Sequence, residues 1–317
     1  METRRTMLKS MTAGALGALV APAFAHTDLN PGMKMMPVDT RNVRGGWELP
    51  ARNYVQVKDV KIGQGLPKTI ASTTAKTPEA FLEQISYYAT LPGLDCVDIR
   101  PDYLPVMSGK AFADLMQEGY KRAGHLGVEV SLRDKLEGGG RQYSDAEADK
   151  FWTDYLTNGG QADFCDFEMF RDIKSIRKLV GIAHERGMKV MLSDHEFGWT
   201  PSEDDMLRRL LFLEKEGSDI LKMAVWANNM EDCLRLMSVT WKYHNYYGTH
   251  PLCTMAMGPI GCLSRVTGQF TGNDLTFVIA GKSGSAPGQY PLNDVLAMMK
   301  MFQSTMQSKA AQTRTDK

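Results

Sequence analysis

The sequence carries no excess of charge of either sign. Its 317 residues include 37 lysines and arginines against 37 aspartates and glutamates, so the formal net charge at pH 7 is zero. Binding to nucleic acid or to an acidic membrane surface through bulk charge requires a basic surplus, so we expect no nucleic-acid partner. Beyond the N-terminal region the chain also lacks any apolar run long enough to cross a bilayer, so we expect no stable membrane anchor.

Cysteines are few, and their spacing matches no metal motif. There are five, an odd number, and none forms a C-x-x-C pair, so we expect no metal site. Cys96, Cys165 and Cys253 lie in apolar runs typical of strands, where a thiol acts as a small hydrophobic side chain. We therefore expect buried free thiols, with Cys233 and Cys262 as the other two. A disulfide framework would be unusual in a chain of this size.

The N-terminal region, residues 1–25, has the layout of an export signal. Arg4 and Arg5 form a twin-arginine pattern, a short apolar stretch follows, and Ala23 and Ala25 stand where a signal peptidase reads small residues. A cytoplasmic N-terminus that happens to hold two arginines would explain neither the apolar stretch nor the cleavage site. We therefore expect recognition by the twin-arginine export machinery, cleavage before residue 26 and a periplasmic protein.

After this signal the chain divides into three parts. Residues 26–48 are polar and rich in proline and glycine, which predicts an irregular arm. Residues 49–308 form the predicted catalytic domain, and residues 309–317 form a polar tail. The domain opens with apolar and polar residues that alternate from Tyr54 to Ile62 around an aspartate-centred turn, which predicts a β-hairpin.

Strand-like and helix-like segments then alternate eight times. Most strand-like segments are apolar on both faces, as expected for a buried parallel sheet. Eight strand–helix units in about 250 residues are typical of an α/β TIM barrel, and we predict a (β/α)8 barrel whose N-terminal hairpin closes the bottom. The alternative, a doubly wound open sheet, is disfavoured because no G-x-G-x-x-G follows the first strand. The predicted strands span residues 69–73, 96–100, 127–132, 164–168, 189–193, 220–225, 252–256 and 276–280.

Lys222 is the only charged residue in the apolar run from Ile220 to Trp226. The run has the composition of a buried strand, and lysine is rarely buried without a partner. Burial disfavours the ammonium form, so we expect a lowered pKa for Lys222 and a free amine that can form a Schiff base with a carbonyl substrate. The alternative is a lysine at a strand end whose ammonium group reaches water.

Polar residues recur where the predicted strands end, and TIM barrels build their active sites at the carboxyl ends of the strands. His195 follows the fifth predicted strand and is suited to move protons, because histidine titrates near neutrality. A carboxylate would orient this histidine, and arginines would bind an anionic substrate. Taken singly, each residue has an ordinary explanation, such as an ion pair between Asp98 and Arg100. The full set comprises Ser72, Asp98, Arg100, Arg133, Glu137, His195, Lys222, Arg265, Ser285 and Gln289.

Six short motifs occur in order along the chain. They are Val97-Asp-Ile-Arg-Pro-Asp102, Leu132-Arg133 with Glu137-Gly-Gly, Ser193-Asp-His-Glu-Phe197, Leu221-Lys-Met-Ala-Val225, Met255-Ala-Met257 with Ser264-Arg265, and Ser285-Ala-Pro-Gly-Gln289. Together they resemble the motifs of type I 3-dehydroquinate dehydratase. The resemblance runs from about Tyr54 to about Phe302 and implies a TIM barrel that uses no metal or organic cofactor. It also implies that the substrate is 3-dehydroquinate, which loses water to give 3-dehydroshikimate.

The resemblance assigns roles to these residues. Lys222 would form an imine with the C3 ketone. His195, paired with Glu137, would take a proton from C2 and return it to the leaving hydroxyl. Arg265 would hold the substrate carboxylate, and Met257 would pack beside the imine. The substrate-binding positions implied in this way are Ser72, Asp98, Arg100, Arg133, Met257, Arg265, Ser285 and Gln289.

Three functions remain open on the sequence alone: an exported dehydratase, another Schiff-base lyase or aldolase, and a non-catalytic periplasmic binding protein for a cyclic hydroxy acid. The arginines favour an anionic cyclic substrate, and the joint presence of Lys222, His195 and Glu137 argues against a binding protein. The export signal favours the use of external quinate over aromatic biosynthesis. Asp98 stands where the family usually has glutamate. A homodimer is compatible with the resemblance.

Overall fold

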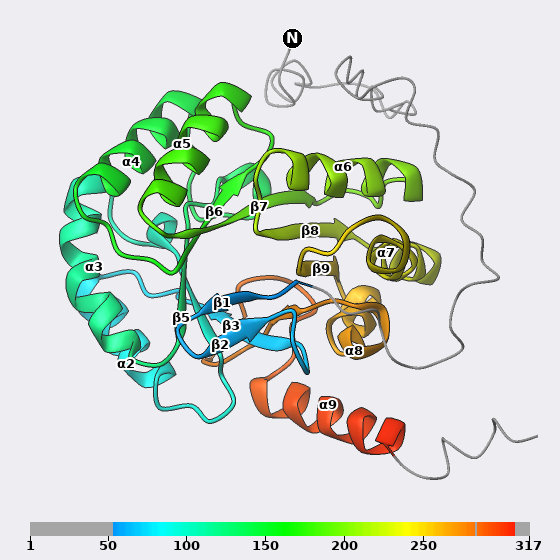
Figure 1. Cartoon of the computed structure of the whole chain (residues 1–317). Coiled ribbons are helices and arrows are strands. Elements are labelled where there is room, and N and C mark those ends of the chain that lie inside the picture. The colour runs from blue at the N-terminus through cyan, green and yellow to red at the C-terminus, as the bar shows by residue number, and fades with distance from the viewer. Residues whose placement is uncertain (1–52, 283, 308–317) are drawn as a thin grey trace, which may run out of the picture. The chain divides into compact units, whose positions relative to one another are not determined.

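The computed structural model describes residues 53–282 and 284–307 of the chain (Figure 1). The predicted export signal, the irregular arm and the polar tail lie outside these residues. In the two described ranges, no helix combines the length and the apolar character that a membrane crossing needs.

Eight parallel strands form the barrel, in the order β10-β3-β4-β5-β6-β7-β8-β9 around its wall. The order follows the chain, with β10 paired to β3, whereas a doubly wound sheet reverses direction along its strand order. Between β9 and β10 the wall is bridged by a hydrogen bond of 2.7 Å from the Asp274 N–H to the Leu252 carbonyl. The predicted TIM barrel is therefore confirmed. The strands are β3 Lys68–Ser72, β4 Cys96–Ile99, β5 Gly127–Ser131, β6 Phe164–Glu168, β7 Lys189–Glu196, β8 Ile220–Trp226, β9 Leu252–Met257 and β10 Leu275–Phe277.

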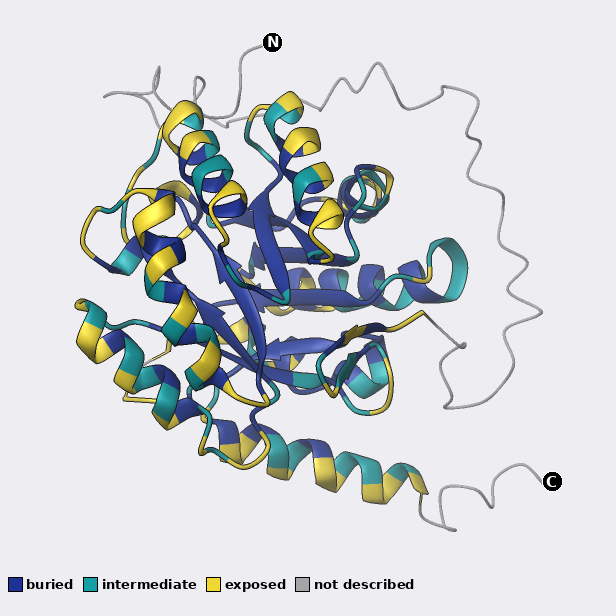
Figure 2. Ribbon diagram, turned by 60° about the vertical axis from the view of Figure 1, so that its left-hand side comes forward, coloured by how far each residue is buried: buried dark blue, intermediate teal, exposed yellow. Residues whose placement is uncertain are grey.

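Amphipathic helices cover the outside of the barrel, and Figure 2 shows their buried inner and exposed outer faces. In α2 the buried residues are Phe81, Ile85 and Tyr88, whose spacing places them on one helical face. A side-chain cap fixes the start of α4, where Ser144 and Glu147 form a reciprocal capping box. The helices are α2 Pro78–Tyr88, α3 Gly109–Ala123, α4 Asp145–Thr157, α5 Ile173–Glu185, α6 Glu203–Lys215, α7 Met230–Lys242, α8 Gly268–Thr271 and α9 Leu292–Gln307.

The predicted hairpin is present and packs against one end of the barrel. Strands β1 (Val55–Val57) and β2 (Val60–Ile62) pair in antiparallel fashion. Their apolar side chains belong to the same buried cluster as Phe164, the first residue of β6. In the turn, Lys58 Nζ donates to the Leu126 carbonyl at 2.6 Å, just before β5. The amino-terminal end of the barrel is therefore covered, which leaves the carboxyl end for chemistry.

The interior of the barrel changes from apolar to polar along the strands. Near the hairpin it is filled by an apolar cluster that includes Ile70, Phe164 and Ile220. Two residues further along β3, β6 and β8, the side chain on the same face is polar. These polar residues are Ser72 on β3, Asp166 on β6 and Lys222 on β8.

Candidate active site

Lys222 lies in the middle of β8 with its side chain inside the barrel. It is 4% exposed, so the alternative in which its ammonium group reaches water is wrong. Its Nζ donates to Asp166 Oδ2 on β6 at 2.8 Å and lies 3.8 Å from Glu129 Oε1 on β5. The ring centroid of Phe277 on β10 is 4.5 Å from the same nitrogen. A buried ammonium group needs such partners, because an unpaired charge is costly away from water.

The expected lowering of the Lys222 pKa is wrong for this structure. Burial alone lowers it, but the acidic groups of Asp166 and Glu129, of which Asp166 has the larger effect, outweigh burial and hold the pKa of Lys222 above its ordinary value. Lys222 therefore rests as an ammonium ion and must lose a proton before it can attack a carbonyl. The apolar run around Lys222 contains no hint of these carboxylates, because they come from other strands.

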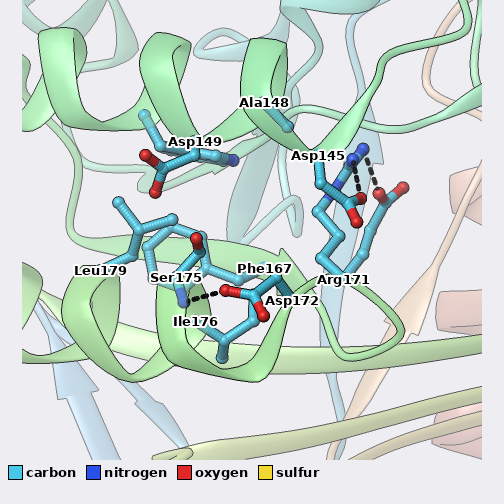
Figure 3. Close-up of a pocket in the computed structure, with 11 residues that line it drawn as sticks. Asp145, Ala148, Asp149, Phe167, Arg171, Asp172, Ser175, Ile176 and Leu179 are labelled. Carbon is cyan, nitrogen blue, oxygen red and sulfur yellow. Dashed lines mark hydrogen bonds and ion pairs between the residues drawn. The ribbon is translucent and has the colours of Figure 1, made fainter. Parts of the chain in front are cut away.

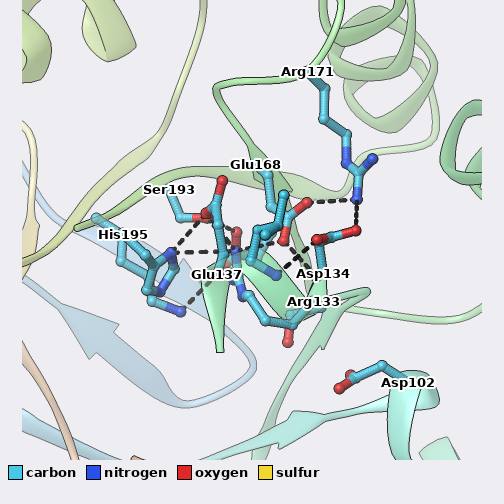
Figure 4. A network of polar contacts seen from close by, with 12 residues as sticks. Asp102, Arg133, Asp134, Glu137, Glu168, Arg171, Ser193 and His195 are labelled. Atoms are coloured by element: carbon cyan, nitrogen blue, oxygen red, sulfur yellow. Dashed lines mark hydrogen bonds and ion pairs between the residues drawn. The ribbon is translucent and has the colours of Figure 1, made fainter. Parts of the chain in front are cut away.

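His195 and Glu137 form a hydrogen-bonded pair at the carboxyl end of the barrel (Figure 4). Nδ1 of His195 lies 3.0 Å from Oε2 of Glu137. Glu137 ends the 3₁₀ turn Lys135–Glu137, and Gly138 follows at φ 85°. A Cβ on Gly138 would lie 2.4 Å from the Phe197 ring, so only glycine fits here. The turn thus holds Glu137 in place while Phe197 stacks against His195 with 6.5 Å between the ring centroids.

His195 is a neutral imidazole at neutral pH. Burial and the positive charges of Arg133 and Lys222 hold the pKa of His195 well below its ordinary value of 6.5. Ser193 of β7 pairs with Lys222 of β8, so His195, two residues further along β7, projects from the same face one layer above the lysine. A neutral histidine in this position can accept a proton from a molecule bound to the lysine.

The prediction that His195 follows the end of a strand is wrong. Strand β7 continues to Glu196, and His195 pairs with Ala224 of β8. The physical reason lies on the outer face, where Arg209 of α6 contacts Asp194 and Glu196 at 2.9 Å each. This buried ion cluster keeps the polar end of β7 extended. The histidine is therefore positioned by a strand, which holds it more rigidly than a loop would.

Arg133 and Arg100 are both engaged by acidic side chains of the protein. Nη2 of Arg133 lies 2.5 Å from Asp166 Oδ2, and its Nη1 donates to Ser193 Oγ at 2.8 Å. Arg133 stands in the centre of the polar network drawn in Figure 4. Arg100 forms a bidentate pair with Asp102, at 2.8 Å for both contacts, rather than with the aspartate two residues before it. Both predicted residues thus lie at the site and balance its acidic groups.

Asp98 accepts hydrogen bonds from two serines. Ser131 donates to its Oδ1 at 2.5 Å, and Ser72 donates to its Oδ2 at 2.6 Å. Ser72 Oγ also lies 2.9 Å from Ser285 Oγ, which in turn accepts from Gln289 at 3.1 Å. The structure therefore brings the predicted residues of β3, β4 and the segment after β10 into one hydrogen-bonded chain.

Arg265 is a buried cation whose guanidinium group is largely unpaired. It ends the 3₁₀ segment Ile260–Arg265 that follows β9 and Met257, and it is 1% exposed. Its Nη2 donates to the Pro287 carbonyl at 3.0 Å, but its Nε and Nη1 have no hydrogen-bond partner among the described residues. Burial lowers the pKa of Arg265 to about 10. Such a group is costly unless an anion binds to it, so Arg265 is suited to hold a substrate carboxylate.

Two acidic residues beside Lys222, Asp166 and Glu129, were missed by the sequence reasoning. Burial raises the pKa of Asp166, but the positive charges of Arg133 and Lys222 outweigh it and hold that pKa well below its ordinary value. Each of the two is an acidic residue within a buried, largely apolar strand. This is the same signal that singled out Lys222, so the pattern could have identified them.

A small hollow lies outside the barrel wall, between α4 and α5 (Figure 3). Its lining includes Trp152 and Ile176. Arg171, also in the lining, lies 3.4 Å from Asp145 and 2.6 Å from Glu168. The hollow contains none of the predicted site residues, so we do not assign it to the site. In the described part of the chain, no group of three or more histidines, cysteines and acidic residues is arranged to hold a metal ion.

Two relatives show how far the likeness to known proteins extends. A 3-dehydroquinate dehydratase of Clostridium kluyveri is 32% identical over 252 residues, which cover 79% of this chain and 98% of the relative. A protein of Acinetobacter baylyi named catabolic 3-dehydroquinate dehydratase is 35% identical over 250 residues, which cover 78% of this chain and 91% of the relative. Both likenesses include nearly the whole of the relative.

Solved structures and the family pattern agree with these relatives. The type I 3-dehydroquinate dehydratase of Clostridium difficile has a TM-score of 0.75 at 27% identity, covering 80% of this chain and 99% of its own. The Enterococcus faecalis enzyme has a TM-score of 0.73 at 30% identity, covering 78% and 99%. The family described as type I 3-dehydroquinase matches residues 69–306. The chain therefore belongs to the type I 3-dehydroquinase family, a family of carbon–oxygen lyases.

Proposed function

We propose that this protein removes water from 3-dehydroquinate to give 3-dehydroshikimate through an imine on Lys222. One observation carries the proposal: a buried lysine, a neutral histidine paired with a carboxylate, and a buried, largely unpaired arginine occur at one end of the barrel. The lysine suits a ketone, the histidine suits proton transfer, and the arginine suits a carboxylate. 3-Dehydroquinate carries both the ketone and the carboxylate.

Imine formation begins when Lys222 gives up its extra proton. His195 is neutral and lies one layer above, so it can take up this proton directly or through a water molecule. The free amine then attacks the C3 ketone to form a carbinolamine. The imidazolium of His195 returns its proton to the carbinolamine hydroxyl, which leaves as water, so that an iminium cation remains at Nζ and His195 is neutral again. Asp166, 2.8 Å from Nζ, stabilises that cation by charge attraction in the barrel interior.

Elimination then requires one proton to move from carbon to oxygen. Neutral His195 takes the proton from C2, and the electron pair passes into the iminium to form an enamine. The imidazolium gives the proton to the hydroxyl at C1, which leaves as water and restores the iminium. Glu137, 3.0 Å from Nδ1, stabilises the imidazolium between the two steps. Hydrolysis of the iminium releases 3-dehydroshikimate and Lys222.

We also propose that the protein is exported to the periplasm and serves quinate catabolism there. The location rests on the twin-arginine pattern at Arg4 and Arg5 with the short apolar stretch and cleavage site after it. The role is supported by the likeness to the Acinetobacter baylyi protein, whose name describes it as catabolic. An exported dehydratase has access to substrate formed from quinate outside the cytoplasm. An enzyme of aromatic biosynthesis would instead act in the cytoplasm.

The activity is tested by mixing purified protein with 3-dehydroquinate and following the ultraviolet absorbance of the conjugated enone product. We expect a rise in absorbance that stops when substrate is exhausted and that is absent with Lys222→Met. An aldolase would cleave a carbon–carbon bond and form no enone. A binding protein would change its thermal stability with substrate but produce no absorbance change, and either result would contradict the proposal.

A further inference from the structure

Glu129 is a buried carboxyl group that the mechanism above does not use. It lies on β5 with its side chain inside the barrel and is 0% exposed. Its Oε1 is 3.8 Å from the Nζ of Lys222. Neither of its oxygens accepts a hydrogen bond from any residue of the described ranges. A carboxylate buried in this way without donors would be strongly disfavoured.

The neighbouring acid, Asp166, has the donors that Glu129 lacks. Its Oδ1 accepts from Ser193 at 2.5 Å, and its Oδ2 accepts from Arg133 at 2.5 Å and from Lys222 at 2.8 Å. The ammonium group thus lies 1.0 Å closer to Asp166 than to Glu129, by the difference between 3.8 and 2.8 Å. One of the two carboxyl groups is therefore equipped to stay ionised, and the other is not.

The charged groups that face Glu129 come from three other strands. Asp98 lies on β4, Asp166 on β6 and Lys222 on β8, and all three influence its titration. The thiols of Cys96 on β4 and Cys253 on β9 also lie close enough to interact electrostatically with Glu129. Burial raises the pKa of Glu129, and the positive charge of Lys222 opposes this increase. The negative charges of Asp98 and Asp166 raise the pKa further, so that it lies well above its ordinary value.

We propose that Glu129 works in its neutral, protonated form, as a hydrogen-bond donor to Asp166 that limits how strongly Lys222 is held as an ammonium ion. This inference rests on the proposed imine mechanism. Glu129 keeps its proton throughout the reaction and makes no covalent bond. In this form the Glu129 O–H is a donor that Asp166 can accept, and such a hydrogen bond would draw charge away from the oxygen that faces Lys222.

Ionised Glu129 would have the opposite effect on the lysine. A full negative charge about 4 Å from an ammonium group stabilises it by a factor of about a thousand at the effective dielectric constant of protein sites. The free amine would become rarer by the same factor, and imine formation would slow accordingly. A proton on Glu129 therefore leaves a single full negative charge, that of Asp166, in contact with Nζ.

A matched pair of substitutions tests the role. Glu129→Gln keeps the shape and the N–H donor in a neutral group, whereas Glu129→Met is neutral and has no donor. We expect Glu129→Gln to lower kcat by no more than a few-fold and Glu129→Met to lower it at least tenfold. Asp166→Asn provides the contrast, because the same acid-to-amide change removes the ionised carboxylate and should lower kcat at least a hundredfold.

The titration of Lys222 gives a second readout that a purely structural role would not move. The pH dependence of Lys222 labelling by an amine-reactive reagent, read by mass spectrometry, reports its free amine. We expect half-maximal labelling at the same pH in Glu129→Gln as in the wild type, because glutamine replaces one neutral hydrogen-bond donor with another. In Glu129→Met it should shift to a higher pH than in Glu129→Gln, because Asp166 regains its full charge.

Each other outcome overturns the proposal. If Glu129→Gln folds but loses turnover as severely as Asp166→Asn, Glu129 acts as an ionised group. If Glu129→Gln does not fold, its carboxyl group is not replaceable by a neutral donor, which also contradicts the proposal. If both variants match the wild type in turnover and in Lys222 labelling, Glu129 has no part in the reaction. Borohydride trapping of wild-type Lys222 with substrate separates these results from a failure of the imine mechanism itself.

Discussion

The ammonium group of Lys222 and the carboxylate of Asp166 form a direct ion pair, with 2.8 Å between Nζ and Oδ2 and both side chains buried. The same Oδ2 lies 2.5 Å from Nη2 of Arg133, so one carboxylate oxygen forms ion pairs with two cations. Because this pairing raises the pKa of Lys222 despite burial, the resting site holds a protonated lysine beneath a neutral His195. In the proposed mechanism, activation is therefore a proton transfer away from Lys222, followed by attack on the ketone.

Three alanine substitutions separate chemistry from positioning. Lys222→Ala and His195→Ala should each lower kcat by about a hundred- to ten-thousand-fold, since in the proposed mechanism one residue forms the covalent bond and the other moves protons. Asp98→Ala should lower kcat much less, because Asp98 accepts hydrogen bonds from Ser72 and Ser131 and does not contact Lys222 in this way. Steady-state rates on protein shown to be folded by circular dichroism provide the comparison. Near-normal turnover of His195→Ala would refute the proton-transfer role.

The acid limb of the pH profile should lie below the ordinary titration range of histidine. The pKa of His195 is held well below 6.5 by burial and by Arg133 and Lys222, so the base form is present at neutral pH. It is lost only as pH falls through the depressed pKa, so kcat/KM should stay high at pH 6.5 and decline further down. The profile of kcat/KM between acidic and neutral pH measures this. A decline centred at or above pH 6.5 would show that His195 is not the base.

Arg265→Met should weaken substrate binding and stabilise the unliganded protein. Hydrogen bonds to charged groups contribute about 1.5–3 kcal/mol, so KM should rise by about ten- to a hundredfold. Removing a buried guanidinium whose Nε and Nη1 are unpaired should raise the free energy of unfolding by about 1–3 kcal/mol. Substrate kinetics and urea unfolding measure the two effects.

Arg209→Met is the matched control for this stability change. Arg209 is also buried, but it contacts Asp194 and Glu196 at 2.9 Å each. Breaking buried ion pairs costs about 3–5 kcal/mol, so this substitution should destabilise the protein. Equal destabilisation by Arg209→Met and Arg265→Met would show that Arg265 is not a vacant anion site.

Arg4→Lys combined with Arg5→Lys should leave an uncleaved and active precursor in the cytoplasm. In the proposed export signal the paired arginines are the address that a receptor reads, whereas the candidate site residues all lie in the barrel. Cell fractionation with an activity assay measures the distribution, and Arg41→Lys with Arg44→Lys, outside the proposed signal, provides the control. Normal periplasmic activity of the first double variant would contradict the signal assignment.

The fold was predictable because each local pattern agrees with it. Strands apolar on both faces, separated by amphipathic helices, admit few arrangements, and the alternation of residues from Tyr54 to Ile62 indicates a hairpin in the same way. The continuation of β7 past His195 was not predictable, because it depends on Arg209 of α6. This arginine contacts Glu196, which lies 13 residues earlier in the sequence. Patterns along one segment do not report a partner of this kind.

Most residues that the structure brings together at the candidate site were predictable, apart from Asp166 and Glu129, whereas the electrostatics of the site was not. Lys222, Glu137 and His195 follow from residue type and place in the strand order. The charge state of Lys222 depends on Asp166 and Glu129, which are 56 and 93 residues away in sequence and come from other strands. The pKa of Lys222 depends on its distances to these two residues across the barrel. Burial alone would lower this pKa, and the two acidic residues raise it above its ordinary value.

The most direct measurement is reduction with borohydride during turnover, followed by mass spectrometry of the peptides. The account predicts irreversible loss of activity that requires substrate, with the mass of the reduced ligand added at Lys222 through a secondary amine. Lys189, on the neighbouring strand but 42% exposed in its side chain and paired with Asp219, should remain unmodified and provides an internal control. A ligand adduct on a different lysine, or none while the enzyme is turning over, would contradict the imine on Lys222.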